Sequence, residues 1–180
     1  MQVLLALLLG FAVVSAAPQD RWVNDYDQNL NYACQNHQSI SQIISAHSDK
    51  HEDRLWDFSC QNTFNNVTYC SWSGYANDFD EELNYICPFG TVLSGMNSYH
   101  DNRKEDRRWK FLCCQGETAI LSNCKWSGYI NDFDSYLRWD APPNYYLVGV
   151  QSYHDNYRED RRWNYYSCQK PEVEKGIISP

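Results

Sequence analysis

The sequence predicts an all-β, disulfide-bonded single domain made of three tandem repeats of about 53 residues. Three observations support this prediction. Two short motifs occur three times in constant register, which indicates triplication of one module. Short apolar alternations bounded by turn residues favour strands. Eight cysteines in 180 residues are typical of a disulfide framework in a secreted chain. We expect pseudo-threefold symmetry in a trefoil-like or prism-like arrangement.

The repeats are defined by the motifs Asp-Arg-x-Trp and Asn-Asp-aromatic-Asp, which recur at offsets of 53 and then 54 residues. The second and third copies also share longer matches, such as Ser98–Asn102 with Ser152–Asn156. The repeats span about 20–61, 70–115 and 124–169. The Asp-Arg-x-Trp motif contributes Asp53, Arg54 and Trp56, then Asp106, Arg107 and Trp109, and finally Asp160, Arg161 and Trp163.

Residues 1–16 are expected to be a signal peptide, because an apolar run closes in small residues and is too short for a membrane span. The domain would then cover 17–170 and a tail would cover 171–180. No second long apolar run follows, so we expect secretion to the extracellular space or matrix without membrane insertion. Asn66 begins the sequon Asn-Val-Thr in a polar stretch, and glycosylation is expected there.

The cysteines appear and disappear in pairs between copies, which constrains their bonding. The second copy has Cys70, Cys87, Cys113 and Cys114. The first copy lacks the equivalents of Cys70 and Cys114, and the third copy lacks the equivalents of the other two. An unpaired thiol is a liability in a secreted protein, so paired loss indicates bonded partners. The predicted disulfides are Cys34–Cys60, Cys70–Cys114, Cys87–Cys113 and Cys124–Cys168. Zinc is not expected, because paired C-x-x-C units are missing.

Four segments of the second copy are strand candidates, namely 72–75, 83–87, 91–99 and 108–114. The last two are joined by the polar residues 100–105 and resemble a hairpin. Strand alternation places Cys113 and Cys114 on opposite faces, so the second strand of the hairpin should be central and buried. A helix is an open alternative at Ser39–Ala46, where the apolar residues also fit helical spacing.

The Asp-Arg-x-Trp motif is expected to be structural. Its Asp and Arg can form a bidentate salt bridge and its Trp can anchor the core, which would lock the base of each hairpin. The Asn-Asp-aromatic-Asp motif suits turn capping. Calcium binding through Asp78 and Asp80 is less favoured, because the Gly and the distal Glu of an EF-hand loop are missing. No metal site is therefore expected.

The hairpin loops are the candidate ligand-binding sites. Their side chains are charged or short and planar, and such groups can make paired hydrogen bonds to hydroxyl or sulfate groups. Residues 101–110 carry a local charge of +2, which is compatible with an anionic glycan. The alternative is a solvated loop whose charges pair with one another. The candidate residues are His100, Asp101, Asn102, Arg103, Glu105, His154, Asp155, Asn156, Arg158 and Glu159.

Two function classes are disfavoured. A net charge of −8 argues against nucleic acid, because phosphate binding needs a basic surface. Enzymatic activity is also not expected, and neither is a cofactor. Glu105–Asp106 and Glu159–Asp160 are adjacent carboxylates, but neighbours in the chain do not by themselves flank a glycosidic bond. No nucleophilic cysteine remains if all eight are bridged, and no common hydrolase or phosphate-binding motif occurs.

The repeated Asp-Arg-x-Trp motif, the opening Trp22–Tyr26 and the acidic composition rich in Tyr, Trp and Cys resemble the dermatopontin family. The resemblance is closest to its shorter members, the hemagglutinin/amebocyte aggregation factors, and covers about residues 20–170. It implies a secreted, disulfide-bonded, non-enzymatic protein of matrix, cell adhesion or agglutination, with proteoglycans and matrix proteins as partners. A long Tyr-rich acidic tail and an Arg-Gly-Asp tripeptide are missing, so tyrosine sulfation and integrin binding are not implied.

We therefore expect an adhesive or agglutinating protein that binds cell-surface or matrix glycans, matrix proteins, or both. Related loops on one rigid scaffold would gain avidity by effective concentration. A structural matrix protein without sugar recognition is the main alternative. The third hypothesis is a secreted polysaccharide hydrolase acting through Glu105 and Glu159. The sequence does not predict the oligomeric state.

Overall fold

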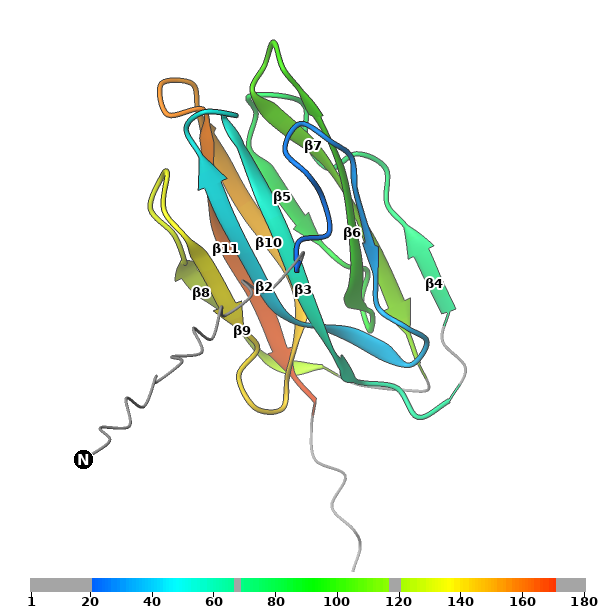
Figure 1. Ribbon diagram of the computed structural model, residues 1–180. Coiled ribbons are helices and arrows are strands. Elements are labelled where there is room, and N and C mark those ends of the chain that lie inside the picture. The colour runs from blue at the N-terminus through cyan, green and yellow to red at the C-terminus, as the bar shows by residue number, and fades with distance from the viewer. Residues whose placement is uncertain (1–20, 67–68, 117–120, 171–180) are drawn as a thin grey trace, which may run out of the picture.

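The computed structural model describes residues 21–66, 69–116 and 121–170, which form eleven strands in three antiparallel sheets (Figure 1). The all-β prediction is confirmed. The expected signal peptide and the expected tail lie outside the described residues. Among the described residues, no helix is long and apolar enough to span a membrane. The strands are β1 (Leu30–Ala33), β2 (Gln38–Ser48), β3 (Asp53–Asn62), β4 (Tyr69–Trp72), β5 (Leu83–Ile86), β6 (Val92–Asp101), β7 (Asp106–Gln115), β8 (Ser122–Tyr129), β9 (Leu137–Asp140), β10 (Tyr145–Asp155) and β11 (Asp160–Gln169).

Each sheet is built around one long hairpin, which is β2–β3, β6–β7 or β10–β11. The short strand beside the hairpin comes from a different repeat. β1 pairs with β6, β5 pairs with β10, and β9 pairs with β2. Each repeat therefore gives one strand to the next, and the last repeat gives one back to the first. A fourth strand completes two of the sheets, β4 on β7 and β8 on β11.

The helix alternative at Ser39–Ala46 is wrong, because this segment lies inside β2. The register of β2 against β3 shifts between Ile40 and Gln42, so that Ser41 is an extra, bulged residue. The bulge lets Ile40 and Ile43 both reach the core at a spacing of three residues. This spacing imitates one turn of a helix and explains why the sequence pattern was ambiguous.

The bulges of the three hairpins also bind the chain next to the exchanged strands, which are the short strands β1, β5 and β9 that pair with the hairpin of another repeat. The bulged residues are Ser41, Ser94 and Val148, and their carbonyls accept main-chain hydrogen bonds of 2.8 Å from Ala141, Cys34 and Cys87. The next residue in the second copy is Gly95. A Cβ atom at Gly95 would lie 2.7 Å from the carbonyl oxygen of Tyr32 in β1. Glycine is therefore required there by the close approach of the exchanged strand.

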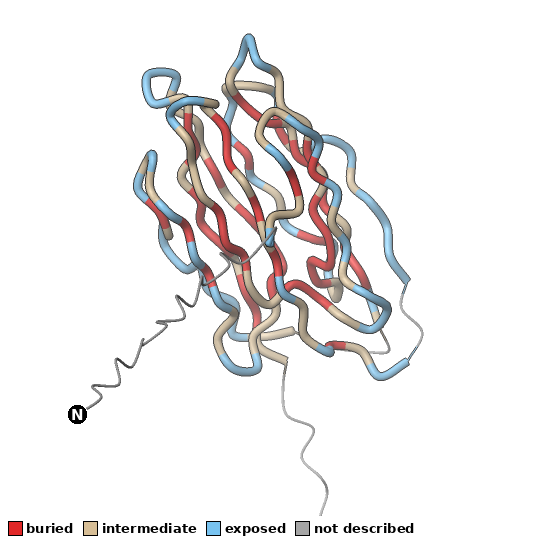
Figure 2. Tube along the Cα trace, viewed as in Figure 1, coloured by how far each residue is buried: buried red, intermediate tan, exposed pale blue. Residues whose placement is uncertain are grey.

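All three sheets contribute to one hydrophobic core. Figure 2 shows buried residues along the long strands and exposed residues mainly at the turns and short edge strands. At the centre, Trp56, Trp109 and Trp163 pack edge to face, with ring centroids 5.0 to 5.1 Å apart. Each tryptophan comes from a different repeat, so the repeats share this packing.

Four disulfides join Cys34 to Cys60, Cys70 to Cys114, Cys87 to Cys113 and Cys124 to Cys168. These are the pairs expected from the paired loss of cysteines, and each lies within one repeat. Two bonds, Cys70–Cys114 and Cys124–Cys168, hold β4 and β8 on their sheets. The other two tie the chain after β1 and β5 back to the hairpin of its own repeat. These two bonds therefore cross from one sheet to another.

Candidate functional site

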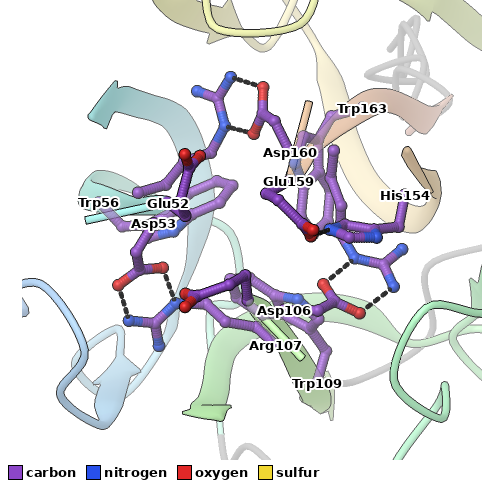
Figure 3. Close-up of a pocket in the computed structure, with 13 residues that line it drawn as sticks. Glu52, Asp53, Trp56, Asp106, Arg107, Trp109, His154, Glu159, Asp160 and Trp163 are labelled. Atoms are coloured by element: carbon purple, nitrogen blue, oxygen red, sulfur yellow. Dashed lines mark hydrogen bonds and ion pairs between the residues drawn. The ribbon is translucent and has the colours of Figure 1, made fainter. Parts of the chain in front are cut away.

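The three Asp-Arg-x-Trp motifs meet and form three salt bridges around a small pocket (Figure 3). Each aspartate pairs with an arginine of a different repeat. The sequence predicted that each motif stabilises the base of its own hairpin. The salt bridges instead join neighbouring repeats. Both side chains of every pair are almost fully buried, and each pair is bidentate with N–O distances of 2.5 to 2.7 Å. The pairs are Arg54–Asp160, Arg107–Asp53 and Arg161–Asp106.

The Asn-Asp-aromatic-Asp motif fixes these salt bridges from outside. In the second copy, the Oδ1 atom of Asn77 accepts the N–H of Trp109 at 3.0 Å, and its Nδ2 donates to the carbonyl of Arg107 at 2.9 Å. The N–H of Asp80, which has a φ of 65°, donates to the carboxylate of Asp106 at 2.9 Å. The other two copies make the same contacts. The motif therefore positions the salt-bridging aspartates through its turn.

The carboxylate of Asp106 is held in the ionised form. Burial alone would raise the pKa of Asp106, but hydrogen bonds and charge from Arg161 outweigh burial and lower this pKa. Among the described residues, three groups of His and Asp side chains have oxygen and nitrogen atoms close enough to ligate a metal ion. Two of these groups use Asp53 or Asp106, whose carboxylates already engage arginine, and the third uses Asp134, which pairs with Arg158 at 2.8 Å. The arrangement is that of a salt-bridge network.

The pocket is bordered by Glu52, Glu105 and Glu159 and has the three buried tryptophans among its lining residues (Figure 3). Each glutamate has a φ of 44° or 45°, which non-glycine residues rarely adopt. Burial raises the pKa of Glu105 and Glu159. The charges of His100 and His154 act in the opposite direction and lower the pKa of Glu105 and Glu159, respectively, but by less. The pocket volume of about 30 Å³ suits one or two water-sized groups. The three carboxylates are thus brought together around one small pocket.

The predicted ligand residues His100 and His154 are buried. The side chain of His100 is 1% exposed, with Nδ1 3.7 Å from Asp27 of the first repeat and Nε2 3.7 Å from Glu105. His154 has the same surroundings in the third repeat. The histidines therefore lie between carboxylates of two repeats and do not reach the loop surface.

The rest of the second hairpin loop is largely paired within the protein. The carboxylate of Asp101 accepts the N–H of Arg103 at 2.9 Å, and Lys104 makes a 2.6 Å salt bridge with Asp80. Asn102 is exposed, and its Oδ1 lies 3.3 Å from Nδ1 of His100. The side chain of Arg103 is 91% exposed. This loop therefore offers Asn102 and Arg103 to a ligand.

The third hairpin loop has the same construction. Asp155 accepts main-chain hydrogen bonds from Tyr157 and Arg158, and Arg158 makes a 2.8 Å salt bridge with Asp134. Asn156 is exposed, and Tyr157 is 89% exposed. An aromatic side chain therefore replaces the exposed arginine of the second loop.

A site that the sequence reasoning missed lies on the outer face of the β6–β7 hairpin. Tyr99 packs edge to face against Tyr75 and Phe79, with centroids 5.3 and 5.4 Å apart. Arg108 and Lys110 lie 4.8 and 4.2 Å from the ring centroid of Tyr75. We call these five residues the second-copy patch. A shallow groove of about 540 Å³ adjoins it, lined by Asn29, Asn31, Tyr75, Asn97, Ser98 and Tyr99.

The β10–β11 hairpin carries a matching third-copy patch of Tyr129, Phe133, Tyr153 and Arg162. Tyr153 packs against Tyr129 and Phe133 at 5.1 and 5.6 Å, and Arg162 lies 5.2 Å from the ring centroid of Tyr129. The first copy has Ala46 at the position of the central tyrosine. Aromatic faces, amides and cations together suit sugar rings and their hydroxyl groups. The tyrosines shared by the second and third copies were the available sequence signal.

This architecture defines a class of disulfide-bonded β-domain that presents related surfaces from repeated units. The chain belongs to the dermatopontin family, whose family model matches residues 24–173. It is 46% identical over 152 residues to the hemagglutinin/amebocyte aggregation factor of Limulus polyphemus, covering 83% of this chain and 88% of the relative. It is 38% identical over 148 residues to dermatopontin of Biomphalaria glabrata, covering 82% and 99%.

A further relative is Millepora cytotoxin-1 of Millepora dichotoma, which is 37% identical over 146 residues. That match covers 81% of this chain and 65% of the cytotoxin. No solved structure matches the chain significantly. Proteins of the dermatopontin and hemagglutinin type are generally non-catalytic.

Proposed function

We propose that the protein is secreted and acts in the extracellular space or matrix as a non-enzymatic adhesion and agglutination protein. The observation that carries this proposal is the similarity to the Limulus hemagglutinin/amebocyte aggregation factor across most of both chains. Four disulfides suit the oxidising environment outside the cell. Cell-surface or matrix glycans, proteoglycans and matrix proteins would be its partners.

In this proposal the three repeats are related by pseudo-threefold symmetry in a prism-like arrangement, and two of them bind. The second-copy and third-copy patches, with the exposed residues of the adjoining hairpin loops, form the glycan-binding surfaces. Asn102, Arg103, Asn156 and Arg158 would extend each surface toward the loop end. Two weak sites on one rigid scaffold gain avidity, and sites on different sheets can engage different cells.

The charges of the patches suggest different preferences. Asp80 and Asp134 neutralise Lys104 and Arg158 in the loops, which weakens the expected attraction for anionic glycans. Lys110 adds positive charge to the second-copy patch, whereas Asn164 occupies the equivalent position in the third. The second-copy patch would therefore favour an acidic sugar and the third-copy patch a neutral one.

Haemagglutination by the purified protein, with competition by free sugars, tests this proposal. Tyr75→Ala and Tyr129→Ala should each weaken binding at one patch by about tenfold, which corresponds to about 1.4 kcal/mol, and the double variant should lose agglutination. Phe89→Ala is the matched control, because Phe89 is 89% exposed and belongs to neither patch. Agglutination that persists in the double variant and is insensitive to every sugar would refute glycan recognition by these patches.

Two further measurements separate the alternatives. Co-precipitation with matrix proteins that survives glycan removal would favour a purely structural matrix protein. Polysaccharide turnover that is lost in Glu105→Gln or Glu159→Gln would favour a hydrolase. Glycosylation at Asn66, which is exposed, is part of the proposal and would be seen as a mass shift after glycosidase treatment.

A further inference from the structure

We infer that the outer edge of β3 is a docking site for the β3 strand of a second copy of this chain. This edge stands apart from the others among the described residues. At the sheet edges, β1, β4, β5 and β9 have four residues each and β8 has eight with an irregular register, whereas β3 has ten. Short and irregular edges resist pairing with other strands, and a long regular edge invites it.

The other two sheets show how a strand occupies this position. Pairing of Ser71 with Cys113 places β4 on β7, and pairing of Lys125 with Ser167 places β8 on β11 (Figure 1). Next to β4, Cys113 and Cys114 of β7 are 3% and 2% exposed. The equivalent residues of β3 are Cys60 and Gln61, which are only partly buried. The described residues therefore leave this half of the β3 edge uncovered.

The main-chain groups on this edge follow from strand alternation. Trp56 points its N–H and carbonyl away from β2, since they bond to Asn24 and Val23. Alternate residues share that direction, so Phe58, Cys60 and Asn62 also turn their main-chain groups outward. The N–H of Phe58 is engaged by a side-chain oxygen of Asp57 at 2.9 Å. Within the described part of the chain, no partner bonds to the carbonyl of Phe58, to the N–H or carbonyl of Cys60, or to the N–H of Asn62, so these groups remain for a partner strand.

The chain's own segment before Arg21 is poorly suited to this edge. The offset of 53 residues places Pro18 at the position of Ser71. Ser71 lies opposite Cys113, whose main-chain groups face β4, so the ladder needs an N–H at that position. Proline has no N–H. The cysteines that fasten β4 are also replaced in this copy, by Ala17 and Gln61.

A second copy of β3 fits the edge by its charge and its symmetry. Residues 58–64 carry no charge, and the nearby Asp57 is neutralised by Arg21 at 2.9 Å. Antiparallel pairing centred on Cys60 would place Phe58 of each chain opposite Asn62 of the other. Four main-chain hydrogen bonds would then form, two between the Cys60 residues and two from Asn62 to Phe58. The dimer would join two three-stranded sheets and double the number of proposed binding patches.

Sedimentation equilibrium of the secreted protein at several concentrations tests this inference. We expect twice the mass of one chain at high concentration and a fall toward one chain on dilution. Asn62→Pro removes two of the four hydrogen bonds and should raise the dissociation constant by about tenfold or more. Asn65→Pro is the matched control, because Asn65 is exposed and lies outside β3, and it should dimerise like the unmodified protein.

Hydrogen exchange of the unmodified protein tests the same contact without a variant. The amides of Cys60 and Asn62 should be protected at high concentration and exchange faster on dilution. A single-chain mass at every concentration overturns the inference. Concentration-independent protection that disappears when residues before Arg21 are removed also overturns it, because the chain's own segment would then cover the edge. Dimerisation unchanged in Asn62→Pro would place the interface elsewhere.

Discussion

Replacing Asp53 by Asn tests whether the buried salt bridges hold the repeats together. The substitution keeps the side-chain shape but leaves the guanidinium of Arg107 without its counter-ion. The side chains of Asp53 and Arg107 are 2% and 5% exposed, so water cannot solvate the unpaired guanidinium. Removing one partner of such a buried pair costs about 3–5 kcal/mol. Each kcal/mol corresponds to about 2–4 °C in a domain of this size. The melting temperature should therefore fall by about 6–20 °C.

Thermal unfolding at neutral pH without reductant, followed by near-UV circular dichroism, measures this change. Asp78→Asn is the matched control, since Asp78 pairs with Arg108 at 2.6 Å but the side chains are 77% and 27% exposed. An exposed pair contributes only about 0–1 kcal/mol. The double variant Asp53→Asn/Arg107→Met should be more stable than Asp53→Asn, because no buried charge stays unpaired. A melting temperature for Asp53→Asn no lower than that for Asp78→Asn would refute the reasoning.

Three further predictions concern packing and pH. Gly95→Ala should lower the free energy of unfolding in urea by about 1–3 kcal/mol, because the new Cβ meets a main-chain oxygen at 2.7 Å. Gly74→Ala, with open space around it, should change that free energy by less than about 0.5 kcal/mol. Asp106 has a lowered pKa, so its stabilising contribution is present above its ordinary value of 3.8 and is lost as the pH falls through the folded value. Urea unfolding between about pH 6 and pH 2 should show this loss, with a smaller slope in Asp106→Asn. Glu105 has a raised pKa, so stability falls as the pH rises through that pKa, and Glu105→Gln should melt higher than the unmodified protein at neutral pH.

The local structure of the fold could be predicted from the sequence, but the exchange of the short strands between repeats could not. Polar residues 100–105 between two apolar alternations predicted the β6–β7 hairpin, whose strands pair as far as Asp101 and Asp106. Nothing in the sequence shows which hairpin receives β1, because all copies share the same spacing. The same ambiguity affected the salt bridges. Asp53 and Arg54 are neighbours in the chain, but strand geometry directs Arg54 to Asp160 instead.

The site was predicted less completely because burial depends on the neighbouring repeat. His100 lies in a polar loop and was expected at the surface, but the turn containing Asp27 of the first repeat covers it. The aromatic patch lies within one repeat, but its adjoining groove combines Tyr75 and Tyr99 with Asn29 from a different repeat. A single repeat therefore does not contain enough information to define the groove.

The exchange of strands also explains which disulfides each repeat keeps. A strand given to the neighbouring hairpin can separate from its own repeat, and Cys34–Cys60 and Cys87–Cys113 prevent this for β1 and β5. The third repeat has Ala141 and Ser167 at these positions, so β9 has no such bond. Its attachment to β2 rests on main-chain pairing, on buried side chains such as Trp139, and on the hydrogen bond from Ala141 to the bulge. All three exchanged strands contact the receiving hairpins by noncovalent forces. Among the described residues, however, β9 alone has no disulfide to the hairpin of its own repeat, so its sheet and the β10–β11 sheet are not joined by a covalent bond of this kind.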